Sequence, residues 1–293
     1  MTSETVEAPE APTGSRSRRR PGGWAALAIP SLIFLGVVFF VPLVVMGARS
    51  LTDPSPANYL AIFETRLYGR VLLTTVVTSL IVTGVCLMMG YPYAYLMAHS
   101  KPRSATVLGA LVLLPFWSSF LVRSYAWMVL LQTNGVINQV LQALGLTAEP
   151  LQLMRNTLGV AIGMTHIFLP FMVLPIFVAM RRVDPDLVPA AGTLGARPFT
   201  AFRKVFMPLT MPGVYAGALL VFVLSLGFYI TPALLGSARN AMFSELVVIQ
   251  VSELLNFGLG SALAVVLLIV TVLLLWLGTR VVNLDKVLGQ DGE

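Results

Sequence analysis

The chain has 293 residues, of which 57% are hydrophobic and only 11% are charged, and its net charge is +6. Soluble domains carry about 25% charged residues, so this composition excludes a soluble globular protein and predicts an integral membrane protein. The single cysteine, Cys86, lies in an apolar run, which excludes a disulfide framework and a thiolate metal cluster. The cations lie at the ends of apolar runs, where membrane topology explains them better than nucleic-acid binding does.

The first 23 residues are rich in Pro, Glu, Ser and Arg, and we expect them to form a disordered cytosolic tail. A secretory signal could begin in the same way, with cations before an apolar stretch. The apolar run 24–48 is too long for a signal sequence and has no clear small-residue cleavage site, so we interpret it as a retained span.

Six apolar stretches are long enough to cross the roughly 30 Å of membrane hydrocarbon, which takes about 20 residues. They are 24–48, 70–98, 105–131, 157–180, 212–236 and 261–282. The third and fifth are interrupted by Pro or Gly, so we expect them to be interior helices whose freed backbone groups are satisfied by neighbours. The predicted fold is an all-α membrane protein with a six-helix domain over 24–282 and a cytosolic tail at 283–293.

The distribution of basic residues predicts the orientation of these spans. With the N-terminus inside, most of the Lys and Arg residues fall on cytoplasmic segments. Both termini are therefore predicted to be cytoplasmic, and so is the long segment 181–211, which we call the 181–211 loop.

The 181–211 loop carries two short helical patterns around a turn. Asp184 or Asp186 can cap the first helix, with Pro185 at an early helical position. Gly195 follows as a stop, because glycine takes the left-handed conformation without a side-chain clash. Pro198 can then restart a helix. The sequence predicts a helix-turn-helix near the membrane face.

A basic amphipathic segment that rests on anionic lipid is an alternative for this loop. Arg197, Arg203 and Lys204 would supply the lipid contacts, beside an apolar stripe of the second helix.

The loop also resembles the EAA loop of binding-protein-dependent ABC transporter permeases. The run Ala190-Ala191-Gly192-Thr193-Leu194-Gly195-Ala196 carries the resemblance, with Phe202 and Met207-Pro208-Leu209 after it. In that family the loop is the coupling helix, which docks into a groove on the cytosolic ATPase. The resemblance assigns ATPase contact to Ala190, Ala191, Leu194, Gly195, Ala196 and Phe202. Pro189 stands where the family usually has a glutamate, so no ionic contact is expected from that position.

Four further stretches are similar to the first permease subunit of spermidine/putrescine-type importers. They are 113–138, 150–177, 228–236 and 256–269, and they flank the loop in the family's order. The resemblance implies a permease that works with a second permease subunit, a cytosolic ABC ATPase dimer and an extracytoplasmic solute-binding protein in the bacterial inner membrane. It favours a polyamine as solute, with an opine, a phosphonate or another small solute as alternatives. No Asp or Glu lies inside a predicted span to offset a polycation's charge.

Residues near a helix break in the fifth span are candidates for the translocation path. Phe228, Tyr229, Thr231 and Pro232 combine aromatic faces, a hydroxyl and a break at mid-membrane depth, where transporters commonly bind their solutes. The alternative is that Phe228 and Tyr229 only pack between helices.

Two further path candidates, Trp117 and Arg123, come from the third span. Arg123 is costly in a membrane and such residues are usually functional. It could instead reach the outer surface or pair with Glu245 or Glu253, and Trp117 could instead belong to an interfacial aromatic belt.

The segment 237–256, which we call the 237–256 segment, is predicted to lie outside the membrane. It resembles the family's outer loop, which closes over the pore, and a plain re-entrant loop is the alternative.

The chain has no motif for chemistry of its own. None of its lysines follows a glycine as a phosphate-binding loop requires, so hydrolysis of ATP by that route is excluded. His99 and His166 stand far apart without partner ligands, so we expect no metal, cofactor or catalytic residue. A self-sufficient secondary transporter or channel, the alternative class, would need intramembrane acids or a His relay.

Overall fold

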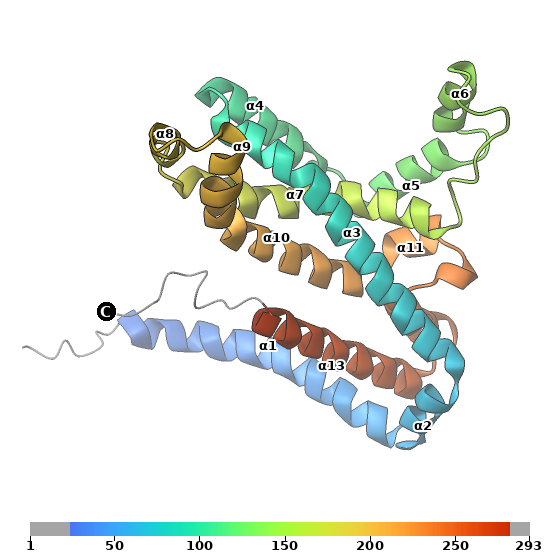
Figure 1. The fold of residues 1–293 in the computed structure, drawn as a ribbon. Helices are drawn as coiled ribbons and strands as arrows, with labels where there is room; N and C mark the ends of the chain where they lie inside the picture. The colour runs from blue at the N-terminus through green and yellow to red at the C-terminus, as the bar shows by residue number, and fades with distance from the viewer. Residues whose placement is uncertain (1–23, 282–293) are drawn as a thin grey trace, which may run out of the picture. The chain divides into compact units, whose positions relative to one another are not determined.

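The computed structural model describes residues 24–281, and all regular elements in this range are helical. The predicted tails, 1–23 and 283–293, lie outside the described residues. The α-helices, labelled in Figure 1 where there is room, are α1 (Trp24–Thr52), α2 (Ala57–Glu64), α3 (Arg66–His99), α4 (Pro102–Leu113), α5 (Phe120–Leu131), α6 (Val136–Ala143), α7 (Thr157–Arg182), α8 (Leu187–Thr193), α9 (Pro198–Ala201), α10 (Met207–Gly227), α11 (Ile230–Leu235), α12 (Phe243–Val248) and α13 (Phe257–Val281). Two short 3-10 helices, η1 (Leu114–Trp117) and η3 (Ala238–Asn240), and two π-helical turns, η2 (Phe202–Phe206) and η4 (Ile249–Glu253), lie between them.

The structure divides into two units, and the boundary falls within α1 between Val45 and Met46. In the first unit, the side chains described from Ile29 onward are mostly exposed and apolar, such as Phe34 at 67% exposure. A helix that is apolar all round suits a lipid environment. The rest of the fold belongs to the second unit.

The helices account for the predicted spans. Among the described residues, five helices are long and apolar enough to cross a membrane. A sixth candidate is the pair Pro102–Trp117 and Phe120–Ala143, which is bent by 97° at its break. The prediction of an all-α membrane protein is confirmed, and so is the interruption of the third predicted span.

The core of the second unit is built around α7. This helix packs against both α3 and α10, and these three helices lie side by side in Figure 1. Met172 of α7 is fully buried, and glycines on the neighbours allow the close approach: a Cβ on Gly217 would lie 3.0 Å from the Met172 carbonyl oxygen. Pro170 and Pro175 lie within α7 without breaking it.

The expectation that the third and fifth spans are the interior helices did not anticipate that the fourth span is more buried than the fifth. In the most apolar stretch of α7, the fourth span, 61% of the residues are buried. In the corresponding stretch of Pro198–Gly227, in the fifth span, 39% are buried. In α4, the first half of the third span, Val112 is the buried residue. The reason is that α7 has helices packed on more than one side, whereas the two halves of the third span diverge at their bend and expose apolar side chains.

The 237–256 segment packs closely against the rest of the second unit. Its middle is packed within the second unit, where Met242 and Phe243 have at most 1% of their surface exposed. The backbone N–H of Phe243 donates to Thr75 Oγ1 of α3 over 2.8 Å, in a buried position. Because α12 also packs against α13, this segment is held against the ends of its neighbouring helices.

Candidate coupling loop and translocation path

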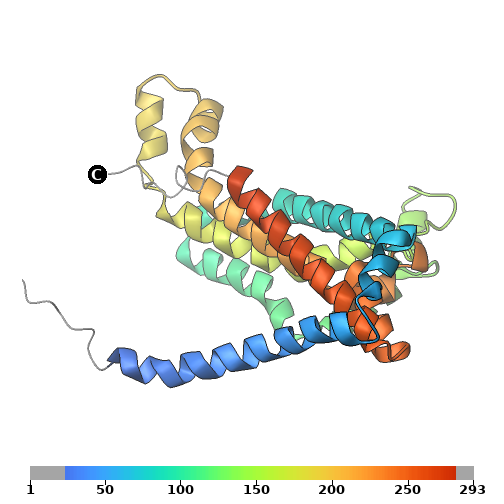
Figure 2. The same cartoon turned by 90° about the horizontal axis from the view of Figure 1, so that it is seen from below.

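The 181–211 loop has the predicted helix-turn-helix form. The carboxylate of Asp184 accepts a hydrogen bond from the N–H of Asp186 over 2.9 Å, just before α8 begins. Gly195 has φ +85°, the left-handed conformation expected of a helix stop. Pro198 opens α9, which continues through the π-helical turn η2 into α10. Figure 2 shows α8 and α9 as two short helices, joined by a turn, at the ends of α7 and α10.

The residues assigned to ATPase contact are mainly at the surface of this loop. Leu194 is 89% exposed, and Ala190 and Gly195 are exposed as well. Ala191 and Ala196 are half-buried. A small-residue surface with one protruding leucine leaves room for another protein's backbone to come close.

Phe202, the sixth residue of that group, points into the chain. Its ring lies 6.4 Å from the Tyr91 ring and 5.8 Å from the Tyr95 ring, measured between centroids, with edge-to-face geometry. Phe206 is 4% exposed, whereas Phe199 is 72% exposed. The second helix therefore turns Phe202 and Phe206 toward α3 and leaves Phe199 on the surface.

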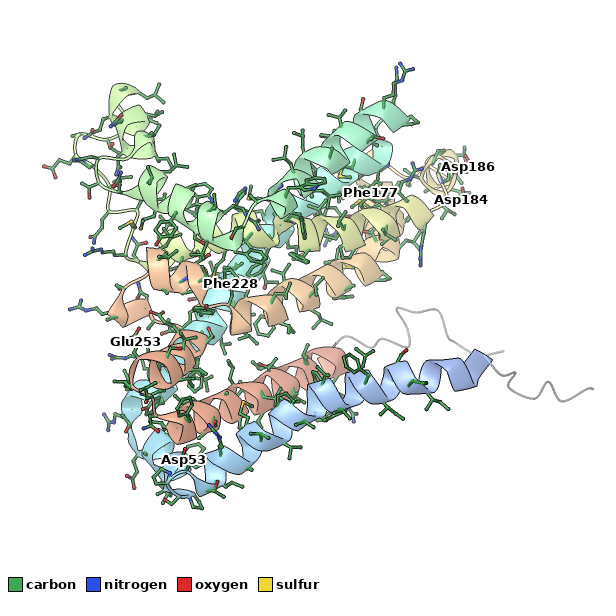
Figure 3. All side chains as sticks on the ribbon, turned by 180° about the vertical axis from the view of Figure 1, so that it is seen from behind. Asp53, Phe177, Asp184, Asp186, Phe228 and Glu253 are labelled. Atoms are coloured by element: carbon green, nitrogen blue, oxygen red, sulfur yellow. The ribbon has the colours of Figure 1, made fainter. Side chains whose placement is uncertain are left out.

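The fifth span breaks at Phe228, as its composition predicted. α10 ends at Gly227, Phe228 is extended, and α11 restarts at Ile230. The carbonyl oxygen of Phe228, freed by the break, accepts a hydrogen bond from Ser244 Oγ over 2.9 Å. In Figure 3, Phe228 lies between the end marked by Asp184 and the opposite end marked by Glu253.

Aromatic rings surround this break. The Phe228 ring lies 5.1 Å from Phe168 of α7 and 5.8 Å from Phe120 of α5, both edge-to-face. The guanidinium carbon of Arg123 lies 4.8 Å from the Phe120 ring centroid, so the arginine charge rests on an aromatic face.

Arg123 is a largely buried cation whose charge lies against the Phe120 ring. It is 7% exposed, and among the described residues no hydrogen-bond partner contacts its buried Nε. The proposed pairing with Glu245 or Glu253 does not occur, and the carboxylate of Glu245 instead accepts from the N–H of Met242 over 3.4 Å. A buried guanidinium without an acid is costly, so its position is not explained by stability.

The other path candidates divide into two groups. Thr231 is fully buried, and its hydroxyl lies 2.8 Å from the Ser124 hydroxyl, which joins α11 to α5. Pro232 is buried in the first turn of α11, where a proline is tolerated. Trp117 is 84% exposed and Tyr229 is 40% exposed, so both face away from the packed interior. The structure thus brings Phe228, Thr231 and Arg123 together through α5.

Several residues of this region were not identified from the sequence. They are Phe120, Ser124, Phe168, Thr75 and Ser244. The serine and threonine residues among them could have been selected from the sequence, because a hydroxyl within an apolar run needs a hydrogen-bond partner. The identity of that partner depends on packing between distant segments.

At the opposite end from the 181–211 loop, Glu245 sits half-buried in α12. Burial raises the pKa of its carboxyl, the hydrogen bond from Met242 opposes this rise, and the nearby Glu253 charge adds to it. Glu245 therefore holds its proton more tightly than a free glutamate does.

The same end carries the arm formed by residues 132–153, which includes α6. One buried side chain, Asn138, holds this arm together. Its amide nitrogen donates to the carbonyls of Gln132, Thr133 and Leu151, and its oxygen accepts from the N–H of Leu151 over 2.9 Å. The opposite face of α6 exposes Val136, Val140 and, just beyond the helix, Leu144.

Comparison with known proteins identifies relatives along most of the chain, although no protein-family model matches it. The spermidine/putrescine transport system permease protein PotB of Haemophilus influenzae is 34% identical over 253 residues, covering 86% of this chain and 87% of that protein. PotB of Escherichia coli is 33% identical over 258 residues, covering 84% and 94% of the two chains.

A solved structure shares the fold. A chain of a bacterial alginate ABC transporter, crystallised with an alginate-bound periplasmic protein, superposes with a TM-score of 0.71 and 15% identity. The match covers 92% of this chain and 97% of that chain. The curated relatives and the shared fold lead to one assignment: the chain belongs to the PotB family of ABC transporter permease subunits.

Proposed function

We propose that this chain is the transmembrane permease subunit of a bacterial ABC importer for a small organic solute, with spermidine or putrescine as the favoured class. The similarity to PotB proteins along most of the chain is the observation that carries this proposal. An opine, a phosphonate or another small solute is the alternative within the same class of importer.

The proposed assembly contains a second permease, an ABC ATPase dimer and a solute-binding protein. This chain supplies up to six spans, half of the twelve that such importers usually use, so a second subunit completes the pore. Its sequence lacks a phosphate-binding loop, so the energy comes from a separate ATPase. We place the assembly in the inner membrane, with both termini and the 181–211 loop in the cytoplasm.

In this assembly the 181–211 loop receives mechanical work. ATP binding closes the ATPase dimer, and residues 184–206 of the two permeases move together. The pore then turns from inward to outward facing, and the docked binding protein releases its solute. The exposed small residues Ala190 and Gly195, with Leu194 beside them, support contact with the ATPase at this place.

The translocation path runs past the break at Phe228. Aromatic faces can stabilise a passing amine through cation–π interaction, and the half-buried Phe228 offers such a face, with the buried Phe168 packed against it. Thr231, Pro232 and Tyr229 complete the break, and Trp117 and Arg123 belong to the third span beside it. Because Arg123 repels a cation, a polyamine would pass on the side of Phe228 away from α5.

The test is reconstitution of the chain with its partners in liposomes and measurement of ATP-dependent uptake of labelled spermidine and putrescine. Saturable uptake that requires both ATP and the binding protein is the expected result. If the complex took up a phosphonate or an opine but no polyamine, that solute would replace the polyamines in the proposal. Solute accumulation by the chain alone on an ion gradient, with no ATPase bound after purification in mild detergent, would overturn the importer assignment.

A further inference from the structure

An aromatic cluster joins the 181–211 loop to the end of α3. It consists of Tyr91, Tyr95 and His99 from α3 and Phe202 and Phe206 from η2. The Tyr95 ring lies 5.8 Å from Phe202, 5.5 Å from Phe206 and 4.1 Å from the His99 ring, which is tilted by 30° against it. Phe202 and Phe206 stack on each other at 5.7 Å, and His99 lies 5.5 Å from Phe206.

A hydrogen bond adds to the ring contacts. The Tyr91 hydroxyl lies 3.1 Å from the hydroxyl of the buried Thr210, which in turn donates to the Met207 carbonyl at the start of α10. The residues of α3 that take part, 91, 95 and 99, recur every four positions, which places them on one face of the helix. Side chains of α3 therefore contact the loop at several adjacent points.

A cavity of about 640 Å³ borders this cluster. Its walls include Tyr95, His99 and Phe206 on one side and Asp184, Val188 and Pro189 from the start of the loop on the other. The first short helix is therefore not packed tightly against α3, whereas the π-helical turn is. The contact between the loop and α3 is therefore made by the π-helical turn.

The other end of α3 contacts the 237–256 segment. Thr75 of α3 accepts the hydrogen bond from the N–H of Phe243, and both residues are buried. Twenty residues separate Thr75 from Tyr95 within the same 34-residue helix, which corresponds to about 30 Å along its axis. One helix therefore contacts a short-helix segment at each end, and these segments lie at the opposite ends marked by Asp184 and Glu253 in Figure 3.

We infer that Phe202 and Tyr95 are positioning residues that make α3 move with the 181–211 loop, so that a push on the loop reaches the 237–256 segment at the far end of α3. This inference rests on the proposed function, because the push comes from the ATPase. Edge-to-face ring pairs are stabilised beyond their buried area, so they favour joint movement of the two helices, and a continuous helix transmits displacement along its length. Phe202 then acts inside the permease rather than at the ATPase surface.

The test uses the complete complex in lipid nanodiscs, with a thiol reporter in the 237–256 segment. Ser252 is exposed and Cys86 is fully buried, so a maleimide would label a Ser252→Cys variant at the introduced site. The labelling rate is measured without nucleotide and with ATP plus vanadate. In the otherwise unchanged protein, the rate should differ between the two states.

Phe202→Leu, which keeps apolar volume but removes the ring, is the main variant. We expect it to reduce the nucleotide-dependent change in labelling at least about twofold, within the range by which residues on a coupling route act. Solute uptake should fall with it, while the ATPase stays bound and continues to hydrolyse ATP. Tyr95→Leu should act alike, and Phe202→Tyr, which keeps the ring, should restore the change. Phe199→Leu is the matched control, because Phe199 is exposed on the same loop.

Two results would overturn the inference. One is a full change in labelling in both leucine variants, which would show that the segment moves independently of the cluster. The other is loss of the ATPase from the Phe202→Leu complex, which would make Phe202 a docking residue. If the proposed function itself were wrong, no ATPase would purify with the unmodified chain. The two kinds of failure can therefore be told apart.

Discussion

The 181–211 loop and the 237–256 segment are both short-helix interruptions between long helices, yet they are built in opposite ways. The loop exposes Leu194 and has open space around Gly195, and the hydrogen bonds beside its turn are local. The segment buries Met242 and Phe243 and is held by partners more than 150 residues away, such as Thr75. Substitutions in the loop should therefore change transport, and substitutions in the segment should first change stability.

The largest expected effect is at Gly258, beside the 237–256 segment. A Cβ there would overlap the carbonyl oxygen of Asp53, a backbone atom that cannot rotate away. Gly258→Ala should therefore lose about 3 kcal/mol or more of stability, at the upper end of overpacking costs. Size-exclusion chromatography in detergent should show little folded protein.

Gly278→Ala is the control on the same helix, because its Cβ would meet Leu219 at an ordinary 3.5 Å. Equal yields of folded protein from the two variants would mean that the segment is less tightly held than its contacts indicate.

Gly195→Val should abolish uptake while the protein still inserts and folds. The residue has φ +85° and no neighbouring atom within 4 Å, so the change strains the turn of an exposed loop. Left-handed backbone costs a non-glycine residue about 1–2 kcal/mol, which one turn can absorb by shifting, at the expense of its docking geometry. Uptake and thermal stability are measured together.

Gly145→Val is the matched control for Gly195→Val. Gly145 has φ +66° and equally open surroundings, but it lies in the arm formed by residues 132–153. Similar strain there should leave ATP-driven coupling intact. If both variants lost ATPase stimulation to the same extent, strain rather than location would be responsible.

The difference between the two regions also explains what the sequence could predict. The loop follows local signals: Asp184 before α8, Gly195 after it and Pro198 at the start of α9. The 237–256 segment has one local signal, the bond from the Met242 N–H to Glu245, but its fold also depends on Thr75 and on the carbonyl of Phe228. The sequence alone is consistent with a loop outside the membrane and with a re-entrant one.

The candidate path shows the same limit. Arg123 and Thr231 were selected by their chemistry, but their neighbours Phe120 and Ser124 became apparent only in the fold. The break was placed correctly near Pro232, although the helix ends earlier, at Gly227. Proline fits the first turn of α11 and so marks the restart of the helix rather than its end.

Thr75→Val removes the acceptor of the buried Phe243 N–H and should destabilise the protein by about 1–3 kcal/mol, the usual penalty of an unsatisfied buried donor. Thermal unfolding in detergent provides the measurement. In Thr83→Val, the lost hydroxyl donates only to the Ser79 carbonyl one turn back, so stability should change little. An equal loss in both variants would show that the contact with α12 contributes nothing specific.

The smallest effect is expected at Glu245. Because burial raises the pKa of its carboxyl above the ordinary 4.5, the folded state binds this proton more tightly than the unfolded chain. That contribution to stability is complete below pH 4.5 and is lost as the pH rises through the raised value. Glutamine stays neutral, so Glu245→Gln should unfold at a higher temperature than the unchanged protein at pH 8. The difference between the two unfolding temperatures should become smaller at acid pH.

Glu149→Gln is the control for Glu245→Gln, because Glu149 is exposed. If the difference in unfolding temperature between Glu245→Gln and the unchanged protein grew toward acid pH, the pKa of Glu245 would not be raised in the folded state.

The role of Asn138 has a wider consequence for the arm formed by residues 132–153. A single amide joins the two ends of this arm through four hydrogen bonds to the backbone, and Ile137 and Leu153 anchor the arm on the main core. Its outward residues, such as Val136 and Val140, are exposed and do not contribute to the packing of the arm. Over evolutionary time such an arm could change the surface it offers to other proteins again and again while its backbone stays the same.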